Sequence, residues 1–247
     1  MTRMAGILVI GALGLLGCEG QAPGRIGDQR AVAAVGLSTA GTGSANGETQ
    51  ESLEVVARRV WGQGGISLSG DVSQDGSELV FVDWETGDLS ALDLRTRETR
   101  RITNKGSWEE SGDYAWNAKL SRDGKRVAYT WAVQEGNTER YELRMIGMDG
   151  RGAYTVYRDE SVGWIQPLAW FPGGDHLLAF ISRQGGVGQL LQISVPGGDS
   201  RILRETDPGF PGMMALSPDG KALIFARAQG EESTNRDIFL TAAASNS

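Results

Sequence analysis

Few residues in this chain of 247 belong to the types that carry most enzyme chemistry. It has one histidine, His176, and one cysteine, Cys18. His176 follows the turn-forming run 171–175, so we expect a solvated turn residue rather than part of a Ser-His-Asp triad or a metal site. Neither a Gly-x-Ser-x-Gly elbow nor a P-loop occurs. The sequence therefore predicts no catalytic residues, no cofactor and no metal.

One acidic segment has ligands that a hard cation would accept. Glu109, Glu110 and Asp113 lie close together in the chain, and carboxylates with loop carbonyls are the ligands that Ca²⁺ prefers. Their spacing matches no EF-hand loop, and acidic loops of this kind are ordinarily solvated. We expect solvated acids here.

Aromatic, acidic and basic residues recur together in segments that we expect to be loops. Exposed aromatics interspersed with arginines are typical of protein interfaces, so these residues form the candidate partner-binding set. The set is Trp84, Trp108, Glu109, Glu110, Asp113, Tyr114, Arg140, Trp164, Arg183, Phe210, Arg227 and Arg236. The alternative is that the tryptophans fill gaps between packed sheets. Trp116, Trp131 and Trp170 fall on expected strands, which favours the core for them.

An internal repeat supplies the elements that must position these residues. The stretch Ser73–Phe81 (SQDGSELVF) recurs as Ser121–Tyr129 (SRDGKRVAY) and Ser217–Phe225 (SPDGKALIF), with a degraded copy at 171–179. The turn positions are Asp75, Asp123, Gly173 and Asp219, at intervals of 48, 50 and 46 residues. A period in this range indicates a propeller or another repeat array.

Each copy is consistent with four short strands. The Asp-Gly pair favours a tight hairpin turn, because glycine adopts positive φ readily. The strand after it is almost wholly apolar, so sheets must pack against sheets. A polar fourth strand, 99–103 in the first copy, suits an exposed edge. We therefore expect an all-β fold, a β-propeller with four four-stranded blades.

These motifs resemble those of the TolB-like, or WD40-like (PD40), β-propeller family of bacterial envelopes. The three Ser-x-Asp-Gly stretches carry the resemblance, together with Asp237–Leu240 and the Met148-Asp-Gly150 turn, and it covers about residues 53–243. It implies a propeller that binds an envelope protein or a peptide. Similar propellers precede the hydrolase domain of prolyl-oligopeptidase-like peptidases. The alternative is therefore a fragment, or a gating or sensor module, of a larger peptidase or signalling protein.

Within a propeller region of 51–247, the expected blades cover about 66–103, 115–157, 165–203 and 212–243. The last copy has no fourth strand of its own. Residues 53–61 match one, since Arg58-Arg-Val60 aligns with Arg100-Arg-Ile102, so this segment is a candidate closing strand. The propeller either closes with four blades or forms part of a larger one.

The two faces of such a propeller differ in their connections. The first-to-second and third-to-fourth turns share one face and are uniformly tight. The connections on the other face are expected to be long, at 83–88, 104–115, 132–140, 158–166, 182–188, 204–212 and 227–236. Long loops on a rigid scaffold commonly carry binding, so we expect the partner there.

The N-terminus has the features of an export signal. Residues 1–17 contain one positive charge and an apolar run too short to span a bilayer. The run ends in Leu15-Leu-Gly-Cys18, which resembles the lipobox of bacterial lipoproteins and implies a lipid on Cys18; Glu19 then resembles an outer-membrane sorting signal. The alternative is an ordinary signal peptide with a chance cysteine. Residues 18–50 are rich in small residues and predict a flexible tether.

The charge balance narrows the choice of partner. The net charge is −7 and no basic run occurs, so a nucleic-acid partner is not expected. We expect an exported, lipid-anchored propeller of the periplasm or cell envelope, on the outer membrane in a Gram-negative cell. It contacts the membrane only through its anchor, and its partner is an envelope protein or a peptide.

Overall fold

The computed structural model describes residues 66–183, 186–206, 214–228 and 236–242, and all their regular elements are strands. In chain order these are β1 (Ile66–Val72), β2 (Glu78–Asp83), β3 (Asp88–Asp93), β4 (Thr99–Arg101), β5 (Tyr114–Leu120), β6 (Arg126–Glu135), β7 (Thr138–Gly147), β8 (Tyr154–Tyr157), β9 (Val162–Trp170), β10 (His176–Arg183), β11 (Gly188–Ser194), β12 (Ser200–Thr206), β13 (Met214–Leu216), β14 (Ala222–Ala228) and β15 (Arg236–Ala242).

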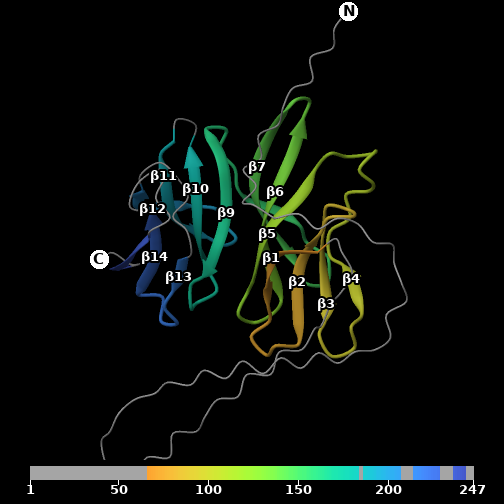
Figure 1. Cartoon of the computed structure of the whole chain (residues 1–247), viewed down its shortest axis with the longest axis horizontal. Helices are drawn as coiled ribbons and strands as arrows, with labels where there is room; N and C mark the ends of the chain where they lie inside the picture. The colour runs from red at the N-terminus through yellow and green to blue at the C-terminus, as the bar shows by residue number, and fades with distance from the viewer. Residues whose placement is uncertain (1–65, 184–185, 207–213, 229–235, 243–247) are drawn as a thin grey trace, which may run out of the picture. The chain divides into compact units, whose positions relative to one another are not determined.

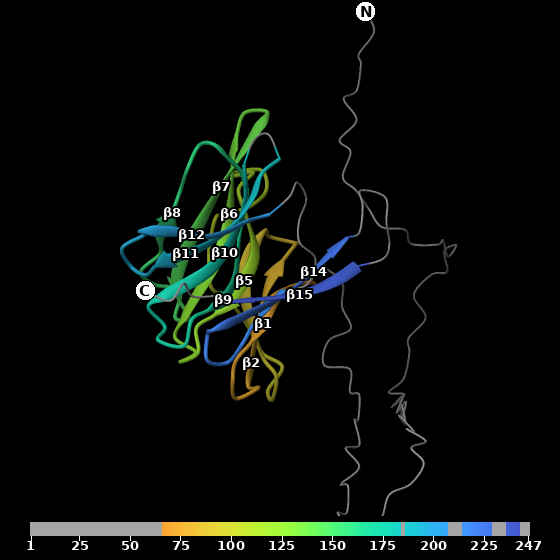
Figure 2. The same ribbon diagram turned by 90° about the vertical axis from the view of Figure 1, so that its left-hand side faces the viewer.

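The strands form four antiparallel sheets, each a meander of consecutive strands (Figure 1). Three sheets have four strands, and the last has three described strands. We number them as blade 1 (β1–β4), blade 2 (β5–β8), blade 3 (β9–β12) and blade 4 (β13–β15). The first strands of the sheets, β1, β5, β9 and β13, are neighbours in that order, which is the arrangement of propeller blades. The prediction of an all-β propeller with four blades is confirmed. Figure 2 looks onto blades 3 and 4.

Several predictions fall outside the described residues. They concern the signal peptide at 1–17, Cys18, the tether at 18–50 and the closing strand at 53–61.

The Ser-x-Asp-Gly motif closes the hairpin between the first and second strands of a blade. In blade 2, the Ser121 hydroxyl donates to Asp123 Oδ1 at 2.6 Å and accepts the Arg126 N–H at 2.9 Å. Gly124 has φ +69°, a conformation that other residues adopt only with strain. Ser217 makes the same two hydrogen bonds in blade 4, at 2.6 and 2.8 Å. The motif recurs because its serine and aspartate form the hydrogen bonds of the turn and its glycine adopts the required positive φ.

The degraded copy in blade 3 closes its turn differently. Phe171 replaces the serine, so the turn keeps the backbone bond of the other blades, here from the Phe171 N–H to the His176 carbonyl at 3.0 Å, but lacks the hydroxyl cap. The Phe171 side chain is 8% exposed and packs in the core between blades 3 and 4. Apolar burial therefore replaces the hydroxyl cap in this blade.

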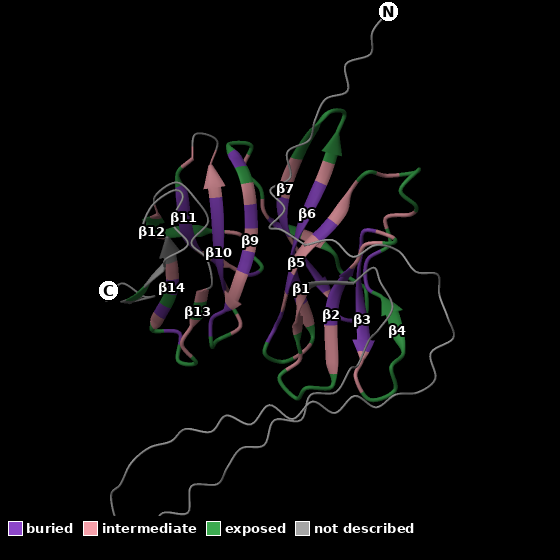
Figure 3. Cartoon of the chain, viewed as in Figure 1, coloured by how far each residue is buried: buried purple, intermediate pink, exposed green. Residues whose placement is uncertain are grey.

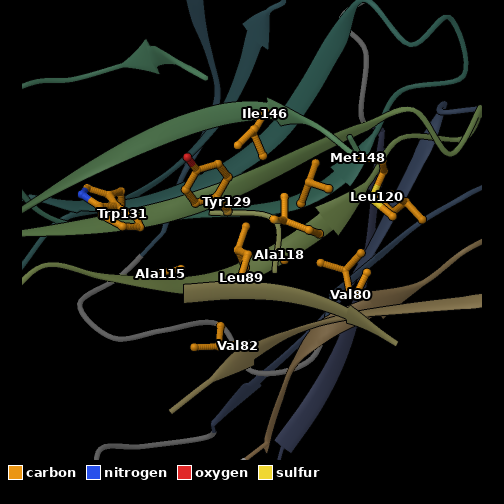
Figure 4. Close-up of a cluster of buried hydrophobic side chains, with 13 residues drawn as sticks. Val80, Val82, Leu89, Ala115, Ala118, Leu120, Tyr129, Trp131, Ile146 and Met148 are labelled. Atoms are coloured by element: carbon orange, nitrogen blue, oxygen red, sulfur yellow. The ribbon is translucent and has the colours of Figure 1, made fainter. Parts of the chain in front are cut away.

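The second strand of each complete blade is buried on both faces, as predicted (Figure 3). One core cluster joins blades 1 and 2, with Val80 and Leu89 from the first and Tyr129 and Trp131 from the second (Figure 4). A second cluster joins blades 2 and 3, and a third joins blades 3 and 4. Of the fourth strands, β4 is entirely exposed and β12 mostly so, whereas β8 is largely half-buried and places Val156 in the core. The cores between adjacent sheets hold the blades together.

A buried polar residue recurs on the third strand, four positions before a buried Leu or Ile. In blade 1, Asp88 is fully buried and accepts a hydrogen bond from the Thr103 hydroxyl at 2.7 Å. In blade 2, Glu142 is 3% exposed and accepts from Thr155 at 3.1 Å. Gln189 holds this position in blade 3 and donates to Glu205 at 3.0 Å. Each pair ties the outer edge of its blade to the third strand, because a buried polar group requires a partner.

The connections opposite the tight turns are shorter than the sequence predicted. The expected loop at 132–140 is a hairpin whose strands pair as far as Glu135 and Thr138 around Gly136, which has φ +64°. Likewise β9 begins at Val162, so only 158–161 connect it to β8. The prediction of long loops at 132–140 and 158–166 is wrong, because β-favouring Val, Thr, Trp and Ile side chains extend the strands into them. This end carries paired strands as well as loops (Figure 1).

Candidate functional site

Six aromatic side chains form one continuous array at the end of the propeller opposite the tight turns. We name it the aromatic array, and its members are Trp84, Trp108, Tyr114, Trp116, Tyr141 and Trp164. From one end, ring centroids are 6.2 Å apart for Trp108–Tyr114, 5.7 Å for Tyr114–Trp84, 4.9 Å for Trp84–Trp116, 6.1 Å for Trp116–Trp164 and 4.9 Å for Trp164–Tyr141. These tilted and edge-to-face contacts are the arrangements that aromatic pairs prefer.

The array crosses three blades. Trp84 lies in the β2–β3 turn of blade 1, Tyr114 and Trp116 begin β5 of blade 2, and Trp164 lies on β9 of blade 3. Tyr114 and Trp116 share one face of β5 because side chains alternate along a strand. A bulge follows at Asn117, whose φ is +38°. Three sheets thus bring together residues that are up to 80 positions apart in the sequence.

The Asn117 side chain helps to join the blades beneath the array. Its Nδ2 donates to Gln166 Oε1 at 2.8 Å, and Trp164 Nε1 donates to the same oxygen at 3.3 Å. The inner strands of blades 2 and 3 are therefore tied directly below the Trp116–Trp164 contact. This makes the array a fixed part of the scaffold.

The array covers the cores but remains partly open to solvent. Trp84, Tyr141 and Trp164 each pack against a different one of the three core clusters. Trp108 is 40% exposed, and the other five rings are half-buried. Trp131 and Trp170 lie in the core, each 5% exposed, as predicted. Trp116 does not, and the prediction of a core position for it is wrong, because it precedes the bulge and faces its aromatic neighbours.

Trp108 holds the outer end of the array. Its Nε1 donates to the Glu85 carbonyl at 3.1 Å, and the Lys105 ammonium lies 3.9 Å from its ring centroid. Gly87 leaves room for this ring, since a Cβ there would lie 2.8 Å from it. The close approach of Trp108 to the β2–β3 turn therefore depends on a glycine.

Two tyrosine hydroxyls converge on Glu139. The Tyr141 hydroxyl donates to Glu139 Oε2 at 2.5 Å, and the Tyr114 hydroxyl lies 3.4 Å from both carboxylate oxygens. Burial and the carboxylate raise the pKa of both tyrosines, so both hydroxyls stay protonated at neutral pH. Glu139 is exposed, and it gives this part of the array a negative charge.

Arg140 is committed to carboxylates outside the array. It lies on β7, where it bonds to Glu135 at 2.9 Å and to the buried Glu142. Arg144 also binds Glu142, at 2.7 Å. Burial opposes ionisation of Glu142, but hydrogen bonds from Arg140 and Arg144 outweigh burial and lower its pKa. Arg140 therefore fills a structural ion-pair network.

The other arginines and the phenylalanine of the predicted set are not members of the array. Arg183 ends β10 and pairs with Asp159 at 2.7 Å, which lowers the pKa of that carboxyl to about 2. Arg227 lies on β14 opposite Asp237, and Arg236 lies on β15 opposite Ala228. Only the backbone of these two arginines is described. Phe210 lies outside the described residues.

The acidic segment next to Trp108 is organised by local hydrogen bonds. Glu110 accepts the Ser107 N–H at 2.8 Å, and Asp113 accepts the Gln134 N–H at 2.9 Å and the Trp131 indole at 3.3 Å. A hydrogen bond from Ser107 lowers the pKa of Glu109. Across the described ranges, no group of three or more His, Cys, Asp or Glu side chains has the geometry of a metal site.

His176 begins β10 beside the tight turn, at the end of the propeller remote from the array. Its Nδ1 lies 3.0 Å from Asp175 Oδ1, and its side chain is 36% exposed. This is the solvated turn position that the sequence predicted. In the described part of the chain, no helix is long and apolar enough to cross a membrane.

The arrangement of blades resembles that of solved β-propeller structures. Neither a protein-family model nor a curated protein sequence matches the chain. Among solved structures, TolB from Acinetobacter baumannii is similar with a TM-score of 0.53 and 18% identity, over 71% of this chain and 41% of that one. A putative TolB from Agrobacterium tumefaciens gives 0.51 and 16%, over 70% and 57%. The chain has the fold of the TolB-like β-propellers.

This TolB-like propeller spans about half the length of the two TolB structures. The same fold occurs in a puromycin-hydrolysing peptidase from Mycobacterium tuberculosis, with a TM-score of 0.53 and 16% identity, over 71% of this chain and 28% of the peptidase. The fold is therefore shared by proteins of different activities, and function must be argued from the site.

Sequence reasoning found four of the six array residues and missed Trp116 and Tyr141. Trp116 is expected on a strand in the core, and Tyr141 follows the expected loop at 132–140. The signal that points to Trp116 is its spacing of two from Tyr114 at the start of an inner strand. Tyr141 is found only through the pairing of β7 with β6, where it lies opposite Ala132.

Proposed function

We propose that this TolB-like propeller is a non-catalytic binding protein of the cell envelope, and that it holds an envelope protein or a peptide on the aromatic array. The observation that carries the proposal is the array itself, six contacting rings that remain partly exposed at the end remote from the repeated turns. Partly exposed aromatic clusters are rare on protein surfaces and are enriched in binding hot spots.

The geometry supports binding by a rigid surface. The rings are supported from below by the cores of three blade pairs and by the Asn117–Gln166 hydrogen bond. A surface that is ordered before binding loses little conformational entropy when a partner docks. The exposed Trp108 lies at one end of the array, and the half-buried Trp164 lies next to Tyr141 at the other end.

The proposal is tested with Trp108→Ala combined with Trp164→Ala in the exported protein. Chemical crosslinking in cells of the native source, followed by purification and mass spectrometry, identifies the partner of the unchanged chain. The double variant should lose that crosslink while its circular-dichroism spectrum remains that of a β protein. A matched control is Val72→Ala with Ile202→Ala, two exposed apolar residues outside the array that are 49% and 51% exposed. Retention of the partner by the array variant, or loss of it in the control, contradicts the proposal.

The envelope location rests on the export signal and on Cys18. Labelling with palmitate should mark the chain and should be lost in Cys18→Ala, and fractionation should place the chain in the envelope. An unlabelled chain that fractionates with the cytoplasm contradicts this part of the proposal.

A second candidate is a gating or sensor module of a larger peptidase. The similarity to the Mycobacterium tuberculosis peptidase favours it, since the same fold forms part of that protein. A hydrolase domain encoded in frame with this propeller in its native gene would favour this candidate. Peptide hydrolysis by the purified chain itself would contradict the non-catalytic reading of the propeller.

A further inference from the structure

The aromatic array lies in an acidic part of the surface. Three of its segments bring carboxylates: Glu85 follows Trp84, Glu109 and Glu110 follow Trp108, and Asp113 precedes Tyr114. Glu139 accepts a hydrogen bond from the Tyr141 hydroxyl and lies 3.4 Å from the Tyr114 hydroxyl. The cations on the same segments are Lys105, Lys119, Arg140 and Arg144. Carboxylates therefore outnumber cations around the rings.

None of these cations neutralises the array. Arg140 is held by Glu135 and Glu142, Arg144 by Glu142, and Lys119 lies beside Asp71. Lys105 lies over Trp108 and donates to the Ser111 carbonyl at 2.7 Å. Among the described residues, Glu139 has no cation within ion-pair distance. Two tyrosine hydroxyls thus fix a carboxylate whose charge is left uncompensated beside the rings.

The Lys105–Trp108 contact shows what such a surface can hold. An ammonium group placed over an indole face is attracted by the negative face of the ring. A cation over the neighbouring rings would have the same attraction and would also have Glu139 as a counter-charge. A carboxylate at that place would meet Glu139 and the surrounding acids, and like charges across an interface reject a partner.

We propose that the aromatic array recognises a basic segment of its partner by seating a lysine or arginine side chain over the rings beside Glu139. This inference rests on the proposed function and specifies that the bound segment of the partner is basic. Charge complementarity selects the occupant: the surface is acidic and aromatic, so the matching segment is a peptide with exposed lysine or arginine. Electrostatic attraction also makes the association faster at low salt than at high salt.

The experiment uses the full chain and defined peptide probes. A Gly/Ser peptide carrying spaced lysines is titrated into ¹⁵N-labelled protein, and the indole N–H signals of Trp84, Trp108, Trp116 and Trp164 are followed. We expect saturable shifts confined to these tryptophans, with those of Trp131 and Trp170 unchanged. The same peptide with Nε-acetylated lysines should bind about tenfold more weakly or not at all, because acetylation removes the charge.

The matched substitution is Glu139→Gln, which keeps an oxygen to accept the tyrosine hydrogen bonds and removes only the charge. It should weaken the lysine peptide about fivefold to tenfold. The control Glu98→Gln changes the net charge equally in the exposed β3–β4 turn and should leave binding unchanged. Equal binding of the acetylated peptide, no effect of Glu139→Gln, or an equal effect of Glu98→Gln overturns the inference.

The outcome separates this inference from the proposed function. If the cellular partner requires Trp108 and Trp164 but is indifferent to Glu139→Gln, the array binds a partner of another chemistry and only the basic-segment inference fails. If the partner is also retained without Trp108 and Trp164, the proposed function fails too.

Discussion

The two ends of the propeller are built in opposite ways. At the turn end, blades 1, 2 and 4 repeat one solution, in which a serine hydroxyl binds an aspartate and the second strand's backbone around a positive-φ glycine. At the other end, each of the first three blades presents something different: a tryptophan in a turn, an aromatic pair on an inner strand, and a tryptophan on β9. The first end repeats because every blade needs the same closure.

The contrast separates structural from functional aromatics. Phe171 at the turn end is buried, and its packing takes the place of the serine hydroxyl that caps the turn in the other blades. The array rings are also packed, but they contact one another across blades and keep part of their surface in solvent. Residues that vary between otherwise equivalent blades are therefore the ones to examine for function.

The largest effect is expected for Phe171→Ser, which restores the serine of the motif to blade 3. Although the change makes the turn resemble the other three, it should destabilise the chain by about 3 kcal/mol, because the lost ring leaves a cavity in the core between blades 3 and 4. Urea unfolding measures the difference. The control Lys221→Ala, an exposed change in the adjacent turn, should cost within about 0.5 kcal/mol. A gain in stability for Phe171→Ser would show that the hydroxyl cap outweighs the packing.

At the opposite end, Trp116→Ala should act on binding more than on stability. It removes the central ring of the array, so partner binding should weaken by about 2 kcal/mol, roughly 30-fold. Titration calorimetry with the purified partner measures this. Unfolding measured in parallel should show a smaller loss of stability, because Trp116 is only half-buried. A stability loss with unchanged affinity would assign Trp116 to packing alone.

A smaller effect is expected for Ser121→Ala. Ser121 is 3% exposed, and its removal leaves the Arg126 N–H without that acceptor. The expected cost is about 1 to 2 kcal/mol in the free energy of unfolding. Ser73→Ala should cost less, because the equivalent hydroxyl in blade 1 is more exposed and water replaces it. Partner affinity should stay unchanged in both variants, and a loss of affinity would mean that the two ends are not independent.

The smallest effect concerns acid stability at the turn end. Hydrogen bonds from Ser73 and Ser77 lower the pKa of Asp75 from 3.8 to about 2, and the pKa of Asp123 and Asp219 is also lowered. Carboxyls with a depressed folded-state pKa stabilise the fold above their unfolded pKa, and this contribution is lost as the pH falls from about 4 towards 2. Replacing all three by asparagine should flatten the loss of stability between pH 4 and pH 2, measured by urea unfolding. An identical loss in both proteins would contradict this role.

The sequence predicts the turn end well because its chemistry is local. Ser121, Asp123 and Gly124 interact within a few residues, so the motif alone implies the hairpin and, by its period, the blades. The array could be predicted only in part. Trp84 and Trp164 meet through Trp116, and that contact depends on how three sheets pack and on the bulge at Asn117. Hairpin extension at 132–140 was missed for the same reason, since strand pairing beyond a turn depends on the partner strand.

The central claim is that a partner binds at the aromatic array and not at the repeated turns. Site-specific photo-crosslinking tests it most directly, with a benzophenone amino acid in place of Trp108 in one variant and of Asp219 in another, both in cells. We predict that irradiation gives a discrete adduct of the same partner from position 108 and none from position 219. An adduct from position 219, or none from position 108, would contradict the account.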